Sequence, residues 1–451
     1  MQNPEIMRNE KIFLILICLP LVMFIGTNQG YFWDEAVFLG LSKNIQHGNY
    51  YINLYQESYR PPLFPMILSM FYLLGDFLKI IPIIFAISMI IITYYFVKKI
   101  INQKVALLSA TFIATAPWII YYSQRILTET LFMLLFTASI FLICLGTEKK
   151  KFLPLTFALF GLAFLTRYQA ILLIPIFFFY ILIIKKTSIL KTKEFFISLV
   201  IFLIILVPWF YIGFTYYTNP YELYIDQLNN GLIYPPEAFQ GPFYFYIINS
   251  IGIFGVSIIL LPLFLRKKVL KNKFNILLLI SMIIIILFFS TMERKEYRYI
   301  VSFSGVFYIA AAYSLISIEK NFKDRKVLFY LVVALILATN LLMASQVMLY
   351  GKYSGQNVMD ASLFLQQRVT ENDFIIGQNY PVINYFSNAN VLDYPKTEEE
   401  FTALAKKYNV KYFVVDYGEF GLPDYINEIN SEEIAEFGED EYKVIVNEIP
   451  S

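Results

Sequence analysis

Residues 274–299 read FNILLLISMIIIILFFSTMERKEYRY, an uncharged and largely apolar run followed at once by a cluster of charges. The apolar part is close to the roughly 20 residues that an α-helix needs to cross a bilayer. The whole chain of 451 residues is 58% hydrophobic and only 16% charged, with a mean hydropathy of +0.59. A chain so large and apolar does not form a single soluble core, so the sequence predicts an integral membrane protein.

Similar apolar runs recur through residues 1–348 and predict a polytopic α-helical membrane protein with about 11 transmembrane helices. The first run follows Arg8 and Lys11 and continues into TNQGYFWDE rather than a small-residue cleavage site, which is typical of an uncleaved signal anchor. The expected spans are 11–28, 78–97, 104–122, 126–146, 152–166, 169–184, 195–213, 244–265, 274–291, 298–317 and 327–348.

The distribution of Lys and Arg predicts the orientation, because cytoplasmic connections collect these residues. With the N-terminus inside, the inner connections hold 21 basic residues and the outer ones 8. The run from Pro62 to Leu74 could count as a further span, but it would place the Lys-rich connections outside. At about 13 residues it is better explained as a half-buried or interfacial helix on the outer face.

Three regions are therefore expected outside the cytoplasm: the outer loops 29–77 and 214–243, and the tail 349–451. The tail holds 7 Lys and Arg against 18 Asp and Glu and has no long apolar run. Its helix-like runs 358–368 and 397–408 alternate with the β-branched or aromatic runs DFIIG, KYFVVDYG and YKVIVNEI. This alternation predicts a small extracytoplasmic α/β domain.

Asp34 and Glu35 stand at the start of a predicted helix in the first outer loop, within YFWDEAVFLGL (31–41). On a helical wheel Asp34 shares a face with Phe38 and Leu41, so we expect it to point toward protein or lipid and Glu35 toward a wetter side. Asp34 could simply cap its helix. A carboxylate on an apolar face is costly without a partner or a task, however, and this favours a functional role.

Other charges gather at the predicted outer ends of spans. Arg125 and Glu129 are four residues apart, a spacing that places them on one helix face. Arg167 lies in a turn between two spans, Arg60 ends QESYRPP, and Arg298 belongs to TMERKEYRY, which also holds Glu293, Arg294, Lys295 and Glu296. Guanidinium groups bind phosphate through paired donors, and a carboxylate can act as general base toward a hydroxyl. The combination suits a reaction between a lipid phosphate ester and an alcohol.

The motif order resembles the polytopic glycosyltransferases of the GT-C superfamily, in particular the protein O-mannosyltransferase and aminoarabinose-transferase-like branch. The segments that carry the resemblance are WDEA, YRPPLFPMI, YYSQRILTE, GLAFLTRYQA and KEYRYIVSF, spread over roughly residues 10 to 315. The resemblance implies inverting transfer of a mannose-like sugar from a dolichyl- or undecaprenyl-type phosphate to an acceptor hydroxyl on the outer face.

The same resemblance implies roles for individual residues. Asp34 matches the position that acts as base or holds the acceptor, Glu35 its acidic neighbour, and Glu129 the second acidic position. The residues that fall near the donor phosphate are Arg60, Arg125, Arg167 and Arg298. Two departures leave the acceptor open: the second outer loop has no motif tied to one acceptor, and the tail is not a β-trefoil.

Several points stay open at this level. The metal requirement is one, since Asp34, Glu35 and Glu129 could hold a divalent cation such as Mg²⁺ or Mn²⁺ through oxygen ligands. The partners implied are the bilayer, a polyprenyl-phosphate-linked sugar, and a protein, lipid or glycan acceptor, with no nucleic acid. A transporter or lipid-linked-sugar flippase would also explain many spans, but the spans contain almost no charges, which favours an enzyme. A purely structural subunit would leave the outer charges without a task.

Overall fold

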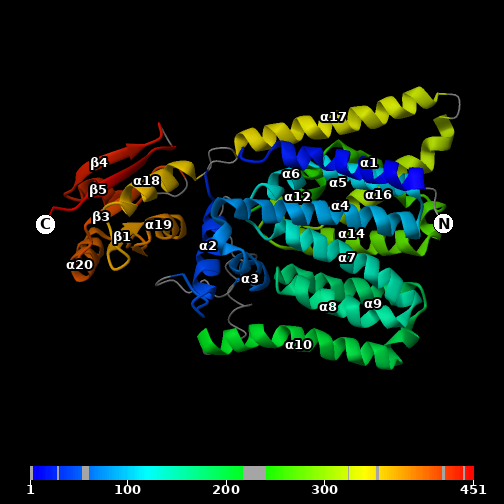
Figure 1. Cartoon of the computed structure of the whole chain (residues 1–451), viewed down its shortest axis with the longest axis horizontal. Coiled ribbons are helices and arrows are strands. Elements are labelled where there is room, and N and C mark those ends of the chain that lie inside the picture. Colours follow the sequence, from blue (N-terminus) through cyan, green and yellow to red (C-terminus); the bar gives the residue numbers. More distant parts are fainter. Residues whose placement is uncertain are drawn as a thin grey trace. The chain divides into compact units, whose positions relative to one another are not determined.

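The computed structural model describes residues 4–27, 30–52, 60–216, 240–322, 325–351, 355–418, 422–439 and 442–450 (Figure 1). The chain divides into two compact units. The first, called here the membrane unit, comprises Met1–Ile25, Tyr59–Phe64 and Asp76–Leu349. The second, called here the mixed unit, comprises Gly26–Ser58, Pro65–Gly75 and Tyr350–Ser451, so that most of the first outer loop groups with the tail.

The membrane unit is a helical bundle whose longest helices can each cross a bilayer. Within the described residues, five helices are long and apolar enough, and a sixth span results if one bent pair is counted. The five are α4 (Ile80–Ile100), α7 (Glu129–Glu148), α10 (Lys193–Tyr216), α14 (Lys273–Thr291) and α17 (Lys326–Tyr350) (Figure 1). The protein is thus a multi-span helical membrane protein, as the sequence predicts.

The bent pair shows why fewer long helices form than the about 11 expected spans. The expected span 104–122 is split into α5 (Gln103–Ala114) and α6 (Pro117–Ser123), which meet at an angle of 60°. Pro117 has no N–H to donate and its ring clashes with the preceding turn, so a helix cannot continue smoothly through it. Helix α1 (Pro4–Met23) has 20 residues, but its first half carries charges. Other expected spans are short or interrupted: α8 (Leu153–Phe164), η3 (Tyr168–Leu172) with α9 (Leu173–Ile183), α12 (Phe245–Ile248), α13 (Ser250–Phe254) and η7 (Val256–Leu265), and α15 (Tyr297–Val301) with α16 (Ser304–Ile318).

Helix α7 is central in this bundle, whereas α10 and α17 are peripheral. The most apolar 18-residue stretch of α7 is 78% buried, against 22% for the corresponding stretches of α10 and α17. Phe132 and Phe136 of α7 pack edge-on against Phe303 at ring-centroid distances of 5.2 and 4.7 Å. The exposed apolar side chains of α10 and α17, such as Leu203 and Leu335, provide the surface that a lipid environment requires.

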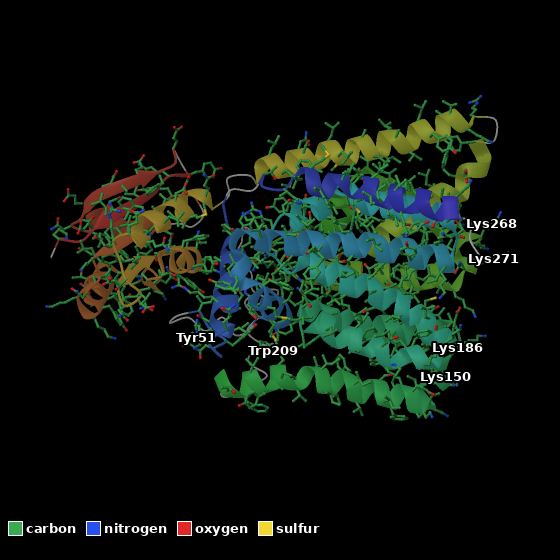
Figure 2. The ribbon with its side chains drawn as sticks, viewed as in Figure 1. Tyr51, Lys150, Lys186, Trp209, Lys268 and Lys271 are labelled. Carbon is green, nitrogen blue, oxygen red and sulfur yellow. The ribbon has the colours of Figure 1, made fainter. Side chains whose placement is uncertain are left out.

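The two ends of the bundle carry different kinds of side chain. Figure 2 shows Lys150, Lys186, Lys268 and Lys271 at one end and Trp209 at the other. Helix α7 links the two ends, because it begins at Glu129 and ends at Glu148, just before Lys150. Twenty residues at a rise of 1.5 Å each separate those ends by about 30 Å. Glu129 therefore lies about a bilayer thickness away from the lysine-rich end.

The mixed unit contains a five-stranded sheet of order β2-β1-β3-β5-β4. Its strands are β1 (Phe374–Gly377), β2 (Asn390–Leu392), β3 (Tyr412–Asp416), β4 (Glu432–Phe437) and β5 (Val444–Glu448). Strands β2, β1 and β3 are parallel, with Ile376 opposite Phe413, whereas β5 runs antiparallel to β3 and β4. The three strand-like runs expected from the sequence coincide with β1, β3 and β5, and this C-terminal mixed sheet confirms the α/β expectation.

Helices cover both faces of the sheet. On one face, α18 (Gln356–Gln366) and α19 (Tyr380–Ser387) share a buried cluster with Val414 and Val446. On the other, Phe401 of α20 (Glu398–Tyr408) packs with Phe413 and Ile445. Helices α18 and α20 correspond to the two predicted tail helices. Helix α19 and strands β2 and β4 were not predicted: β2 has only three residues, and β4 reads EEIAEF, which lacks the β-branched and aromatic run of β1, β3 and β5.

The first outer loop contributes helix α2 (Trp33–Ile45), and the segment Pro62–Leu74 forms α3 (Leu63–Met70) and the start of η1 (Tyr72–Lys79). With eight residues, α3 is too short to cross a bilayer, which agrees with leaving it out of the span count. Residues 53–59 of the first predicted outer loop lie outside the described residues. So do residues 217–239, which make up most of the second predicted outer loop, 214–243.

Candidate active site

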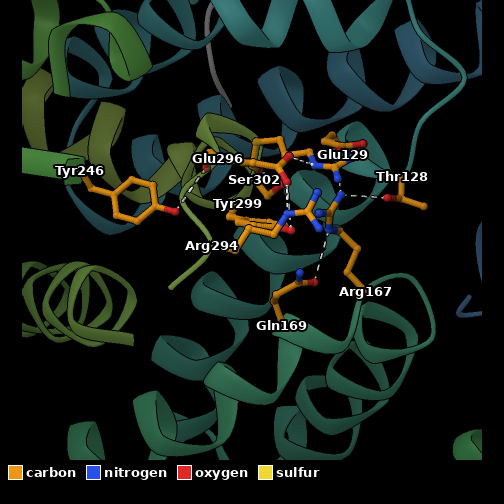
Figure 3. Close-up of polar contacts among 10 residues, drawn as sticks. Thr128, Glu129, Arg167, Gln169, Tyr246, Arg294, Glu296, Tyr299 and Ser302 are labelled. Atoms are coloured by element: carbon orange, nitrogen blue, oxygen red, sulfur yellow. Dashed lines mark hydrogen bonds and ion pairs between the residues drawn. The ribbon is translucent and has the colours of Figure 1, made fainter. Parts of the chain in front are cut away.

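A buried ion pair joins the start of α7 to the turn before η3 in the membrane unit. The Arg167 Nη1 group donates to Glu129 Oε1 at 2.6 Å and to the Thr128 hydroxyl at 3.0 Å, and Nε donates to Gln169 Oε1 at 3.4 Å (Figure 3). The side chain of Glu129 is 3% exposed and that of Arg167 is 12% exposed. Three partners from two elements thus fix the plane of this guanidinium group.

The same bonds leave one nitrogen of Arg167, Nη2 with its two N–H donors, available. Its Nη2 group makes no hydrogen bond to any residue that the structure describes. A guanidinium whose Nε and Nη1 are held by the protein, with Nη2 left for a ligand, is suited to binding an oxyanion.

A second charged cluster precedes α15. Glu296 accepts a hydrogen bond from Nε of Arg294 and forms an ion pair with Arg298, whose Nε lies 2.5 Å from Glu296 Oε2, so two guanidinium groups share one carboxylate (Figure 3). The Tyr299 hydroxyl also donates to Glu296 Oε1, at 3.4 Å. Figure 3 shows Arg294, Glu296 and Tyr299 of this cluster beside Glu129 and Arg167 of the first.

These contacts bring together three of the residues predicted from the sequence and add two more. Glu129 and Arg167 form the first ion pair, and Arg298 belongs to the second cluster through Glu296. Arg294 and Glu296 were noted only as part of a charged span end. Their side chains complete a cluster of three arginines and two glutamates, which retains a net positive charge. Such a surplus favours a negatively charged ligand.

The predicted pairing of Arg125 with Glu129 on one helix face is wrong. The helix is interrupted between Ser123, where α6 ends, and Glu129, where α7 begins. Arg125 therefore lies in the intervening turn, fully buried, with its guanidinium 5.6 Å from the centre of the Tyr121 ring. The side chain that meets Glu129 comes from Arg167, 38 residues further along the chain.

Arg60 belongs to a segment that is hydrogen-bonded to the backbone just before Arg167. The Leu63 N–H, at the start of α3, donates to the Leu165 carbonyl at 2.8 Å. Leu165 is two residues before Arg167, so the RPPL segment and the turn that holds Arg167 are neighbours.

Lys295 stabilises the loop that carries the second cluster. It is buried, and its Nζ donates to the carbonyls of Phe289 (3.0 Å), Ser290 (2.9 Å) and Met292, at the C-terminal end of α14. A cation is favourable at that helix end. Burial lowers the pKa of Lys295, and the nearby charge of Glu293 partly opposes this. Nothing in the local pattern of TMERKEYRY distinguishes Lys295 from its charged neighbours.

Asp34 and Glu35 lie in the first turn of α2, in the mixed unit. Glu35 Oε2 accepts a hydrogen bond from the Phe32 N–H at 2.9 Å, the acidic half of a capping box. Glu35 is completely buried, whereas Asp34 is partly exposed. The predicted orientation of the two acids is therefore wrong, because Glu35 folds back onto the backbone of its own helix.

A divalent-cation site was left open among Asp34, Glu35 and Glu129. Within the described ranges, no three His, Cys, Asp or Glu side chains gather into a group that could hold a metal ion. The carboxylate of Glu35 is engaged by Phe32 and that of Glu129 by Arg167. A divalent-cation site at these acids stays a prediction, and the chemistry below names no step on a metal ion.

Comparisons with known proteins agree with the motif resemblance. Residues 59–212 match the dolichyl-phosphate-mannose-protein mannosyltransferase family. No curated protein matches the chain by sequence. The matched region covers about a third of the chain and includes Arg60, Arg125, Glu129 and Arg167.

Solved structures show the same fold over nearly the whole chain. ArnT from Cupriavidus metallidurans bound to undecaprenyl phosphate aligns with a TM-score of 0.72 at 14% identity, covering 97% of each chain. The apo form of the Archaeoglobus fulgidus oligosaccharyltransferase aligns with a TM-score of 0.70 at 13% identity, covering 90% of this chain and 69% of that one. The likeness extends through both units, and it confirms the GT-C fold that the motifs imply.

Proposed function

We propose that this membrane glycosyltransferase, of the kind that depends on polyprenyl-phosphate sugars, binds its donor phosphate at Arg167 and the neighbouring arginines. Arg167 carries the proposal: it is fixed by Glu129, Thr128 and Gln169 and keeps Nη2 available among the described residues. Arg298, Arg125 and Arg60 are proposed to contribute further positive charge around the phosphate. In this scheme Glu129 orients Arg167 and does not touch the sugar.

We propose Asp34 as the general base. The acceptor hydroxyl oxygen attacks the anomeric carbon from the face opposite the phosphate while its proton passes to the Asp34 carboxylate. The bond between the anomeric carbon and the phosphate oxygen breaks, and the polyprenyl phosphate leaves with one additional negative charge. A single displacement inverts the anomeric configuration. Guanidinium groups already oriented at the phosphate stabilise that growing charge.

The remaining finer points are also proposals. The shorter and interrupted helices complete about 11 spans, the lysine-rich end faces the cytoplasm, and the C-terminal domain (349–451) is extracytoplasmic. The charge distribution supports this orientation. ArnT was solved with undecaprenyl phosphate and the archaeal enzyme AglB with dolichol phosphate and an inhibitory peptide. A phosphorylated polyprenol is accordingly the proposed carrier here, with a mannose-like sugar and a protein, lipid or glycan acceptor.

The function is tested with the full-length protein in lipid nanodiscs and a panel of polyprenyl-phosphate sugars, with loss of each lipid-linked sugar followed by mass spectrometry. One donor should be consumed. Asp34→Asn is nearly isosteric and should lower transfer by about 10² to 10⁴-fold, the contribution of a positioned base. Undiminished transfer by Asp34→Asn would refute the role of Asp34, and the absence of turnover with every donor would refute the donor class. Parallel reactions with EDTA, Mg²⁺ or Mn²⁺ measure cation dependence directly.

A further inference from the structure

Helix α2, which carries Asp34, is packed into the core of the C-terminal sheet rather than standing alone. It lies against α19 within the mixed unit (Figure 1). Ala36 is completely buried in one apolar cluster with Val382 and Ile383 of α19. The two helices are more than 300 residues apart in sequence, so the tail supplies a partner that the first outer loop lacks by itself.

Aromatic contacts hold the segment that directly precedes Asp34. Trp33, its immediate neighbour, meets Tyr380 edge-on, with ring centroids 4.5 Å apart and an interplanar angle of 79°. Tyr31 lies against Phe386 at 5.2 Å. Edge-to-face arrangements of this kind are favoured between aromatic rings. At the other end of α2, Lys43 Nζ donates to Asn388 Oδ1 at 2.8 Å.

The backbone before Asp34 is also held closely. Gly355, the N-cap of α18, has φ +73°, and a Cβ atom built there would lie 2.0 Å from the Tyr31 carbonyl oxygen. Only glycine permits both this backbone conformation and this approach. On the opposite side, the hydrogen bond from Phe32 N–H to Glu35 closes the first helical turn around Asp34.

We propose that the C-terminal α/β region is a positioning domain for the carboxylate of Asp34, with Trp33 and Gly355 as positioning residues. This inference rests on the proposed function of Asp34. Its physical basis is that a base must be held within hydrogen-bond reach of the proton it removes, and that a small displacement of a reacting group is costly in rate. The tail thereby affects turnover without contacting substrate.

The test uses the full-length protein in nanodiscs with two measurements, backbone hydrogen exchange of residues 33–45 and steady-state kinetics. Trp33→Ala should increase exchange in the first turn of α2 and lower kcat by about 10- to 100-fold. The KM for the lipid-linked donor should stay within roughly twofold, because donor binding is separate from the position of the base. Trp33→Phe keeps an aromatic contact with Tyr380 and should restore most of both properties.

Two further variants keep the test decisive. Gly355→Ala loosens the same turn from the α18 side and should repeat the effects of Trp33→Ala. It therefore tests the proposal even where Trp33→Ala does not fold. Thr397→Ala is the matched control, since Thr397 Oγ1 caps α20 by accepting from the Glu400 N–H at 3.2 Å, on the other face of the sheet. It should loosen α20 and leave kcat unchanged.

The possible outcomes separate the two proposals. Increased exchange in α2 with an unchanged kcat, unchanged exchange in both loosening variants, or an equal loss of kcat in Thr397→Ala would each overturn the positioning role. Full activity of Asp34→Asn would instead refute the catalytic role of Asp34. In that case the exchange data would still show whether α19 holds α2.

Discussion

Replacing Arg167 by lysine separates the two tasks that the structure combines in this side chain. The guanidinium holds the buried carboxylate of Glu129 with Nη1 and presents Nη2 as a further donor. Lysine keeps the positive charge beside Glu129 but has a single ammonium group on a flexible stem. It can pair with Glu129 or reach a phosphate, but it cannot hold both in a fixed fork.

The expected magnitude follows from these contacts. A hydrogen bond to a charged group contributes about 1.5–3 kcal/mol. Loss of one such bond to the phosphate should therefore lower kcat/KM for the donor by about 10- to 150-fold, at 1.4 kcal/mol per factor of ten. The stability of the variant should change far less than that of Arg167→Ala. The alanine variant leaves Glu129, which is 3% exposed, as a buried unpaired carboxylate, at a cost of about 3–5 kcal/mol.

The assay compares kcat/KM for the lipid-linked sugar with thermal unfolding of wild type, Arg167→Lys and Arg167→Ala in the same nanodiscs. Lys104→Met is the control, since Lys104 forms an exposed ion pair with Glu319 at 2.6 Å near the opposite end of the bundle. Its activity should equal that of wild type. Retention of kcat/KM within roughly twofold by folded Arg167→Lys would contradict a phosphate-binding role.

Three further predictions follow from other contacts. Lys295→Met removes the donor to the carbonyls at the end of α14 and should lower both transfer and thermal stability, the latter by about 1–3 kcal/mol; an unchanged unfolding temperature would contradict its anchoring role. Phe303→Ala removes a buried ring that packs on Phe132 and Phe136 and should lower the free energy of unfolding by about 3–5 kcal/mol, measured by equilibrium unfolding. Hydrogen bonds from the Thr370 N–H and hydroxyl, at 2.7 and 2.9 Å, lower the pKa of Asp373, so its stabilising effect is present above the ordinary carboxyl pKa and is lost as pH falls through the lowered value. Circular dichroism between about pH 5 and pH 2 should show a smaller acid-induced loss of stability in Asp373→Asn than in wild type, and equal losses would count against the bond.

Sequence reasoning located the regions of the candidate site but not its pairings. The span ends containing Glu129, Arg167 and Arg298, predicted to lie outside, were identified because charges stand out beside apolar runs. The partner of Glu129 was predicted four residues away and is found 38 residues away. Local spacing predicts a neighbour only while a helix continues, and the interruption after Ser123 removes that condition.

The amino-acid sequence by itself determined the membrane character, the end of the bundle that collects lysine, and the main strands of the tail. These properties depend on local hydropathy, charge and side-chain alternation, which can be read along the chain. The tertiary structure alone decided that Glu35 caps α2 and that Glu296 gathers Arg294 and Arg298. It also decided that Lys43 of the first outer loop meets Asn388, 345 residues later. Such contacts form when distant segments fold together, and no local pattern records which distant side chain will be the neighbour.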